Sequence, residues 1–271
     1  MKVSELLGTL TAQLGWTADT PLEGVLTGSP EARVTGISTC SMPSVAILRQ
    51  VVQAGHNVVL CDGHPFYLYD PYWNAQPGLS DMIDAMPQVA AKRKIIEDAG
   101  LAIIRIHSAW QGAKPHSAAL SLARALDLSP GASAKDQDFV LCDLPATNVA
   151  GLARRIRTDG VRLIGDPAWK VARVAVMPGM ASPARLGAAL RDTAVDTVIA
   201  GEVIEWEGGP YMIDVQGAGR NCALLLTGFS VSMDPDATAL ADWARQAFAG
   251  VPVTARHNDG DFIWSVSRAA A

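Results

Sequence analysis

The sequence predicts an α/β protein made of two halves of similar make-up, each with a mixed or parallel sheet and flanking helices. Short apolar runs alternate with segments of helical periodicity along the whole chain. Several of these runs are apolar throughout, which is typical of interior strands of a parallel sheet covered on both faces. A stretch rich in Pro, Gly, Ser and Ala, over Pro130–Gln137, interrupts the alternation. We therefore expect a first half over residues 1–132, to which the C-terminal segment can contribute, and a second half over residues 133–271.

The first half is expected to open with a helix over Val3–Leu14, whose leucines recur on one face and which Gly15 ends. A β-α-β unit follows. Its parts are a strand over Ala32–Thr39, a helix that begins at Ser41–Ser44 and stops at Gly55, and a strand over Val58–Cys61. The other elements predicted here are a loop or hairpin over Thr20–Gly28, a long helix over Ser80–Ala99, a strand over Leu101–Ile106 and a helix over His116–Leu126.

The second half repeats the alternation of strands and helices. Its predicted strands are Phe139–Cys142, Val171–Met177, Thr197–Ala200, Cys222–Leu226 and a closing strand over Asp261–Val266. Its predicted helices are Thr147–Arg157, Pro183–Arg191 with Ser182 as its cap, and a last helix that Asp234-Pro235 opens and that ends near Phe248.

The composition limits the classes of partner. Hydrophobic residues make up 49% of the chain and charged residues 18%, which favours a homo-oligomer whose surfaces cover one another. A net charge of −5 without a long basic run indicates no nucleic-acid or anionic-membrane partner. No signal peptide is recognisable, and no apolar run reaches the roughly 20 residues that span a bilayer, so we expect a cytoplasmic protein. The four cysteines are scattered and predict buried free thiols.

Polar and ring-bearing side chains follow two of the predicted strands directly. Asp62, His64 and Tyr67 come after Val58–Cys61, and His107 comes after Leu101–Ile106. Because ligands bind beyond the carboxyl ends of parallel strands, these residues lie where chemistry is expected. Two converging imidazoles are a common beginning of a transition-metal site, with Asp62, Asp70 or Glu202 as a further ligand. The structural alternative is that each histidine only bonds a loop carbonyl at an ordinary strand exit.

Other catalytic motifs are absent from the sequence. There is no P-loop and no G-x-S-x-G elbow, and Gly217-Ala218-Gly219 does not follow a strand and lacks the third glycine of a dinucleotide fingerprint. Cys40 precedes a helix start, where a thiolate could be activated, but a buried structural cysteine is the simpler interpretation.

A series of short segments, most of them at strand exits, follows in a set order along the chain. The segments are Val34-Thr35-Gly36-Ile37-Ser38-Thr39, Gly63-His64-Pro65, His107 with Trp110 and Gln111, Ala200-Gly201-Glu202-Val203-Ile204-Glu205-Trp206, and Gly228-Phe229. Their order and spacing resemble the NIF-three-like family, whose members are described as dinuclear-metal-centre hexameric proteins or homologues of type 2 GTP cyclohydrolase I. The resemblance spans about Thr17 to Phe248 and implies two related α/β halves, a two-metal site and a trimer-based hexamer.

The chain departs from the ligand pattern that the resemblance implies. Gly63 stands where the resemblance implies a histidine directly before His64, and Ser108 and Gln111 stand where acidic or imidazole ligands are expected. Phe229 replaces the C-terminal histidine and Met233 the glutamate. A phenyl ring cannot bind a metal, and a thioether is a poor ligand for metals that prefer nitrogen and oxygen. We expect no dinuclear centre, and either no cofactor or a single weakly bound divalent metal on His64 and His107.

The hypothesis that follows is a metal-poor remnant of the family pocket that binds or transforms a small polar or aromatic molecule. The enzyme would be of hydrolase or lyase type and use histidine and carboxylate groups as acids and bases. One alternative is a ligand-binding or scaffold ring without catalysis, and another is a metal-dependent hydrolase with rearranged ligands. The predicted catalytic residues are His64, His107, Asp62 and Glu202, and the predicted pocket residues are Tyr67, Trp110, Gln111, Phe229 and Met233.

Overall fold

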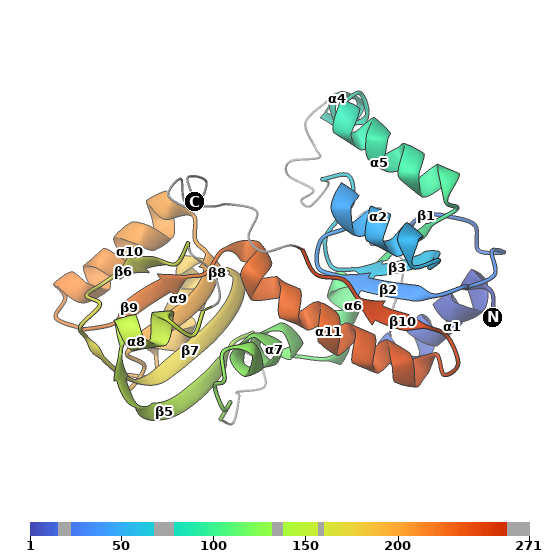
Figure 1. Ribbon diagram of the computed structural model, residues 1–271. Helices are drawn as coiled ribbons and strands as arrows, with labels where there is room; N and C mark the ends of the chain where they lie inside the picture. The colour runs from blue at the N-terminus through green and yellow to red at the C-terminus, as the bar shows by residue number, and fades with distance from the viewer. Residues whose placement is uncertain (16–22, 68–78, 132–137, 157–159, 259–271) are drawn as a thin grey trace. The chain divides into compact units, whose positions relative to one another are not determined.

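A computed structural model describes residues 1–15, 23–67, 79–131, 138–156 and 160–258. The chain divides into two compact units, each with its own sheet. The first comprises Met1–Pro115 with Ala237–Asn258, and the second comprises His116–Asp236. Helices cover both faces of each sheet (Figure 1). The α/β class with two sheet-centred halves, predicted from the sequence, is confirmed.

The first unit is built on a mixed sheet with the strand order β1-β4-β3-β2-β10. Strands β4, β3, β2 and β10 are parallel, and β1 pairs antiparallel with β4. Cys40, Cys61 and Arg105 are neighbours across β2, β3 and β4, so these three strands end level with one another. The chain therefore leaves all three at the same edge. The strands are β1 (Gly24–Thr27), β2 (Ile37–Cys40), β3 (Val58–Cys61), β4 (Ala102–Arg105) and β10 (Val253–Ala255).

Alternate residues of each strand face opposite helical layers. Val58 and Leu60 pack with α1 (Val3–Leu14), α6 (His107–Ala113) and the last half of α11 (Phe229–Ala247). Val59 and Cys61 pack with α2 (Val45–Gln53) and α5 (Pro87–Asp98). Both faces are thus buried, which is why Val58–Cys61 is apolar without alternation.

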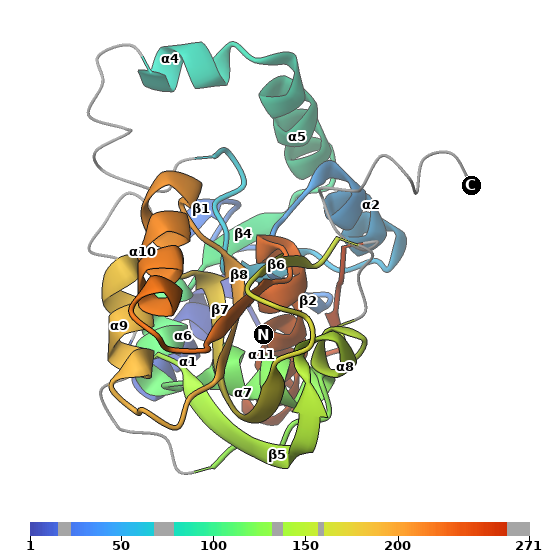
Figure 2. The ribbon, with the colours of Figure 1, turned by 90° about the vertical axis from the view of Figure 1, so that its left-hand side faces the viewer.

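The second unit has a sheet with the strand order β5-β7-β8-β9-β6, in which β7, β8 and β9 are parallel. Helices α7 and α8 pack on one face and α9 and α10 on the other. Figure 2 shows α9 and α10 side by side. The elements are β5 (Val140–Asn148), β6 (Arg162–Ile164), β7 (Lys170–Met180), β8 (Thr197–Glu202), β9 (Ala223–Leu226), α7 (Ser117–Ala125), α8 (Val149–Ala153), α9 (Pro183–Leu190) and α10 (Glu205–Gly217).

The units do not divide at the predicted position after residue 132. Helix α7 belongs to the second unit, because its buried Ala119, Leu122 and Ala123 pack in one cluster with β5 and β7. The C-terminal segment Ala237–Asn258 belongs to the first unit, in line with the contribution that the sequence allowed, because β10 pairs with β2. The predicted strand over Asp261–Val266 lies outside the described residues.

Several helix boundaries differ from those that the sequence predicts, mainly at prolines and caps. The helix expected over Ser80–Ala99 is two helices, α4 (Leu79–Asp84) and α5, because Met86 is extended before Pro87. Strand β5 runs on to Asn148, whose side chain then caps a short α8. The last helix begins at Phe229 instead of Asp234, and Pro235 lies inside it. Helix α10 was not predicted, since Pro210 interrupts its pattern.

No helix in the described parts of the chain combines the length and the apolar character needed to cross a membrane.

The packing of α2 leads to a stability prediction. Leu48 is fully buried against the first sheet, whereas Val52 on the same helix is 42% exposed. Leu48→Ala should lower the free energy of unfolding by about 2–5 kcal/mol, because it leaves a cavity. Val52→Ala should change it by less than about 0.5 kcal/mol. Urea unfolding followed by circular dichroism measures both values, and equal losses would contradict the burial of Leu48.

Candidate functional site

Polar contacts to the neighbouring strand exits and to α5 hold the loop after β3, over Asp62–Tyr67, in place. The Gly63 N–H donates to the Ser41 carbonyl (2.7 Å), and Arg105 Nε donates to the Asp62 carbonyl (2.6 Å). The buried Lys92 on α5 donates from Nζ to the Pro65 carbonyl (2.7 Å). A Cβ atom on Gly63 would overlap the sulfur at the flexible end of Met42 and would lie 3.1 Å from the Ser41 carbonyl oxygen. The loop is therefore fixed to the neighbouring strand exits and to α5.

Asp62 and His107 form the central contact of the site. His107 Nδ1 lies 2.6 Å from Asp62 Oδ1, and both side chains are partly exposed. His107 is the first residue of α6, and the Glu23 carboxylate accepts hydrogen bonds from the next two backbone N–H groups, those of Ser108 (2.5 Å) and Ala109 (3.4 Å). Glu23 thus secures the helix end from which His107 projects.

The pKa of His107 is raised above its ordinary value. The hydrogen bond to Asp62 is the largest cause, and the charges of Asp62 and Glu23 add to it against burial and the nearby Arg105. When His107 is neutral, a Nδ1–H bonded to Asp62 leaves the lone pair on Nε2. That nitrogen is then the one that can accept a proton.

His64 has the opposite character. It is buried, and its Nδ1 accepts a hydrogen bond from the Phe66 N–H (3.1 Å), so the neutral ring carries its proton on Nε2. Burial, with the positive charges of Arg105, Lys92 and Arg93, lowers the pKa of His64 to about 4. His64 is therefore a neutral hydrogen-bond donor at physiological pH.

Two of these cations also touch the aromatic residues of the loop. Lys92 Nζ lies 4.4 Å from the centroid of the Tyr67 ring, and Arg93 Cζ lies 4.2 Å from that of Phe66. Tyr67 has a φ of +63°, which non-glycine residues rarely adopt. Burial lowers the pKa of Lys92. The strained backbone of Tyr67 therefore lies beside the buried ammonium group of Lys92.

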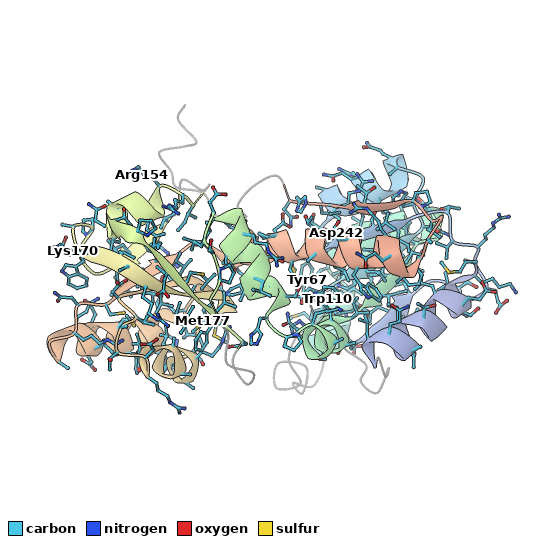
Figure 3. The ribbon with its side chains drawn as sticks, turned by 90° about the horizontal axis from the view of Figure 1, so that it is seen from below. Tyr67, Trp110, Arg154, Lys170, Met177 and Asp242 are labelled. Atoms are coloured by element: carbon cyan, nitrogen blue, oxygen red, sulfur yellow. The ribbon has the colours of Figure 1, made fainter. Side chains whose placement is uncertain are left out.

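The other predicted residues of the first unit differ in how deeply they are buried. Trp110 is only 5% exposed and packs against Trp243, with ring centroids 5.8 Å apart, in the core beneath the sheet (Figure 3). It is a core residue instead of the pocket residue that the sequence predicted, because it lies on the inner face of α6. Gln111 is half-buried on the same helix, and Tyr67 is 41% exposed.

The remaining predicted residues belong to the second unit. Glu202 ends β8, and its carbonyl accepts from the Ala181 N–H (2.8 Å). Phe229 and Met233 lie one turn apart at the start of α11, and both approach Gly179, which has a φ of +71°. Their assignment to one pocket with Asp62, His64 and His107 stays a prediction.

Sequence reasoning missed Arg105, Lys92 and Glu23. Arg105 is the last residue of an otherwise apolar strand, and a buried charge at that position was a usable signal. Lys92 has no comparable signal, since α5 carries several cations. Glu23 accepts a hydrogen bond from a residue 85 positions away in the sequence, so no local pattern could have indicated its role.

Two donor atoms at the loop are already engaged within the protein. His64 uses Nδ1 to accept a backbone N–H, and Asp62 Oδ1 is bonded to His107. Within the described ranges, no three His, Cys, Asp or Glu side chains are grouped to hold one metal ion.

Comparison with known proteins identifies the fold. No family model and no curated protein matches the sequence. Among solved structures, the Bacillus cereus protein related to NIF3 is similar with a TM-score of 0.73 at 12% identity, over 98% of this chain and 99% of that chain. Staphylococcus aureus protein SA1388 has a TM-score of 0.72 at 14% identity, over 98% and 99%. Protein ybgI, described as of unknown function, has a TM-score of 0.72 at 19% identity, over 96% and 99%. The chain therefore has the NIF3-like fold that the order of its strand exits predicted.

Proposed function

We propose that the chain binds a small polar or aromatic molecule and transforms it by general acid–base catalysis, in a reaction of hydrolase or lyase type. The observation that carries this proposal is the 2.6 Å contact between His107 Nδ1 and Asp62 Oδ1 at the shared edge of the parallel strands. A carboxylate that holds one nitrogen of an imidazole prepares the other for proton transfer.

The proposed roles follow from the two nitrogens of His107. Nε2 takes a proton from water or from the substrate, and the Asp62 carboxylate stabilises the imidazolium that forms. The same Nε2–H then returns the proton to the leaving group. The raised pKa of His107 makes Nε2 a stronger base for the first step, and the imidazolium that forms carries the proton needed for the second.

His64 supports this pair through its surroundings. It is buried, and its lowered pKa keeps the ring neutral, so it adds no charge beside His107. Arg105, which holds the Asp62 carbonyl, adds positive charge nearby that would stabilise negative charge developing on a substrate oxygen. The two histidines have different parts, because their surroundings move the two pKa values apart. His64 and Glu202 stay predicted catalytic residues.

The acid–base roles make a prediction about titration. In the wild-type protein, His107 should keep its proton to a higher pH than a free imidazole, and His64 should stay neutral down to a pH of about 4. Asp62→Asn should lower the pKa of His107, because it removes the charge and the charged hydrogen bond that raise it. Glu23→Gln should lower it less, since Glu23 acts only through its charge. Imidazole NMR titration measures these values, and an unchanged His107 in Asp62→Asn would contradict the contact.

The donor set makes a prediction about metal content. Protein purified without chelator should hold fewer than two tightly bound metal equivalents per chain, because His64 and Asp62 use donor atoms within the protein. Elemental analysis after gel filtration measures this. Two tight equivalents, lost together in His64→Ala and His107→Ala, would favour the alternative of a metal-dependent hydrolase with rearranged ligands.

The catalytic roles make a prediction about turnover. A panel of small esters, amides and ring C–N compounds should contain a substrate whose turnover His107→Ala lowers by about 10²–10⁴-fold, which is the usual range for a lost general base. Lys94→Gln, at an exposed pair with Asp98, is the matched control and should have no effect. Ligands that raise the melting temperature but are never turned over would instead favour the ligand-binding ring without catalysis.

A further inference from the structure

A cavity of about 400 Å³ lies beside the loop in the first unit, and neither the proposed chemistry nor the NIF3-like fold assigns a role to it. Its size falls within the roughly 300–1,000 Å³ of small-molecule sites. Apolar side chains form part of its wall, and α5 contributes one cation and one anion. The residues that matter here are Ala32, Phe66, Ile96, Leu101, Arg93 and Glu97.

The apolar wall is closely packed. Phe66, Ile96 and Leu101 are 5%, 4% and 1% exposed and belong to the core between the sheet and α5. A ligand that entered the cavity would therefore meet a packed surface that cannot collapse into the space. That surface suits an apolar group of a ligand.

Arg93 is oriented before any ligand arrives. Its guanidinium stacks on the Phe66 ring, with Cζ 4.2 Å from the centroid, and Nη2 lies 2.6 Å from Asp84 Oδ1. Among the described residues, Asp84 is the only hydrogen-bond partner of this side chain. Because a guanidinium has five N–H donors, the stacked group can still bind a carboxylate.

Glu97 lies one helical turn after Arg93, and both line the cavity. At this spacing Arg and Glu side chains commonly pair with each other, but here Arg93 turns to Phe66 and Asp84. The cavity thus offers a positive and a negative group side by side. A ligand with only a carboxylate would leave Glu97 without a partner, and one with only an ammonium would leave the remaining N–H donors of Arg93 unused.

We propose that this cavity binds a zwitterionic α-amino acid with an apolar side chain. Its carboxylate pairs with Arg93, its ammonium pairs with Glu97, and its side chain lies against Phe66, Ile96 and Leu101. Phe66 also donates its backbone N–H to His64, so the ligand site adjoins the loop of the candidate catalytic residues.

The test pairs probes with variants, using the full chain. L-phenylalanine, 3-phenylpropionate, which lacks the ammonium, and phenethylamine, which lacks the carboxylate, are titrated while the backbone amides of Gly100 and Leu101 are followed by NMR. Wild-type protein should bind L-phenylalanine about tenfold more tightly than either analogue, because each charged pair contributes about that factor.

The variants identify which charged group of the ligand each residue binds. Glu97→Gln should reduce the affinity for L-phenylalanine to that for 3-phenylpropionate, and Arg93→Gln should reduce it to that for phenethylamine. Lys94→Gln, on the same helix but outside the cavity, should bind like the wild type. The proposal is overturned if L-phenylalanine causes no saturable shift at these amides, or if both analogues bind as tightly as the amino acid. Glu97 is exposed, so its variant keeps the test valid should Arg93→Gln fail to fold.

Discussion

The level ending of β2, β3 and β4 is the constraint on which the candidate site depends. Cys40, Cys61 and Arg105 are neighbours across the three parallel strands, so the residues that follow them leave the sheet at one edge. Asp62 and His107 can meet at 2.6 Å only because their strands stop in the same row. A shift of one residue in the pairing would also turn the apolar side chains of β3 to the opposite layers, so core packing and site geometry are set by the same register.

Two neighbouring strand exits give two histidines opposite properties. Arg105 lowers the pKa of both rings. The Asp62 carboxylate, with the charge of Glu23, raises the pKa of His107 against that effect, whereas His64 is buried and accepts a backbone N–H that favours its neutral form. The shared edge of the strands therefore presents a proton acceptor and a neutral imidazole, and the difference comes from the carboxylates beside His107 and from the burial of His64.

Local features of the sequence predicted much of the fold, while contacts between distant residues stayed out of reach. Val3–Leu14, with Gly15 in the left-handed conformation at its end, and Val58–Cys61 have the predicted bounds, because leucine spacing and a buried apolar run are local signals. The Asp62–His107 contact joins residues 45 positions apart, and only the register of β3 and β4 creates it. Trp110 was misplaced for a related reason. It follows His107 by three residues, yet the start of α6 sends the imidazole to the strand edge and the indole into the core.

Gly63 shows how closely the loop packs on the neighbouring strand exit. Its N–H is bonded to the Ser41 carbonyl at 2.7 Å, and a Cβ atom at this position would overlap the Met42 sulfur. A substitution would therefore displace the flexible end of the Met42 side chain and crowd the Ser41 carbonyl oxygen. Arg105 bonds the carbonyl of Asp62, the residue before Gly63. The backbone contacts on the two residues thus fix the position from which the Asp62 carboxylate bonds His107.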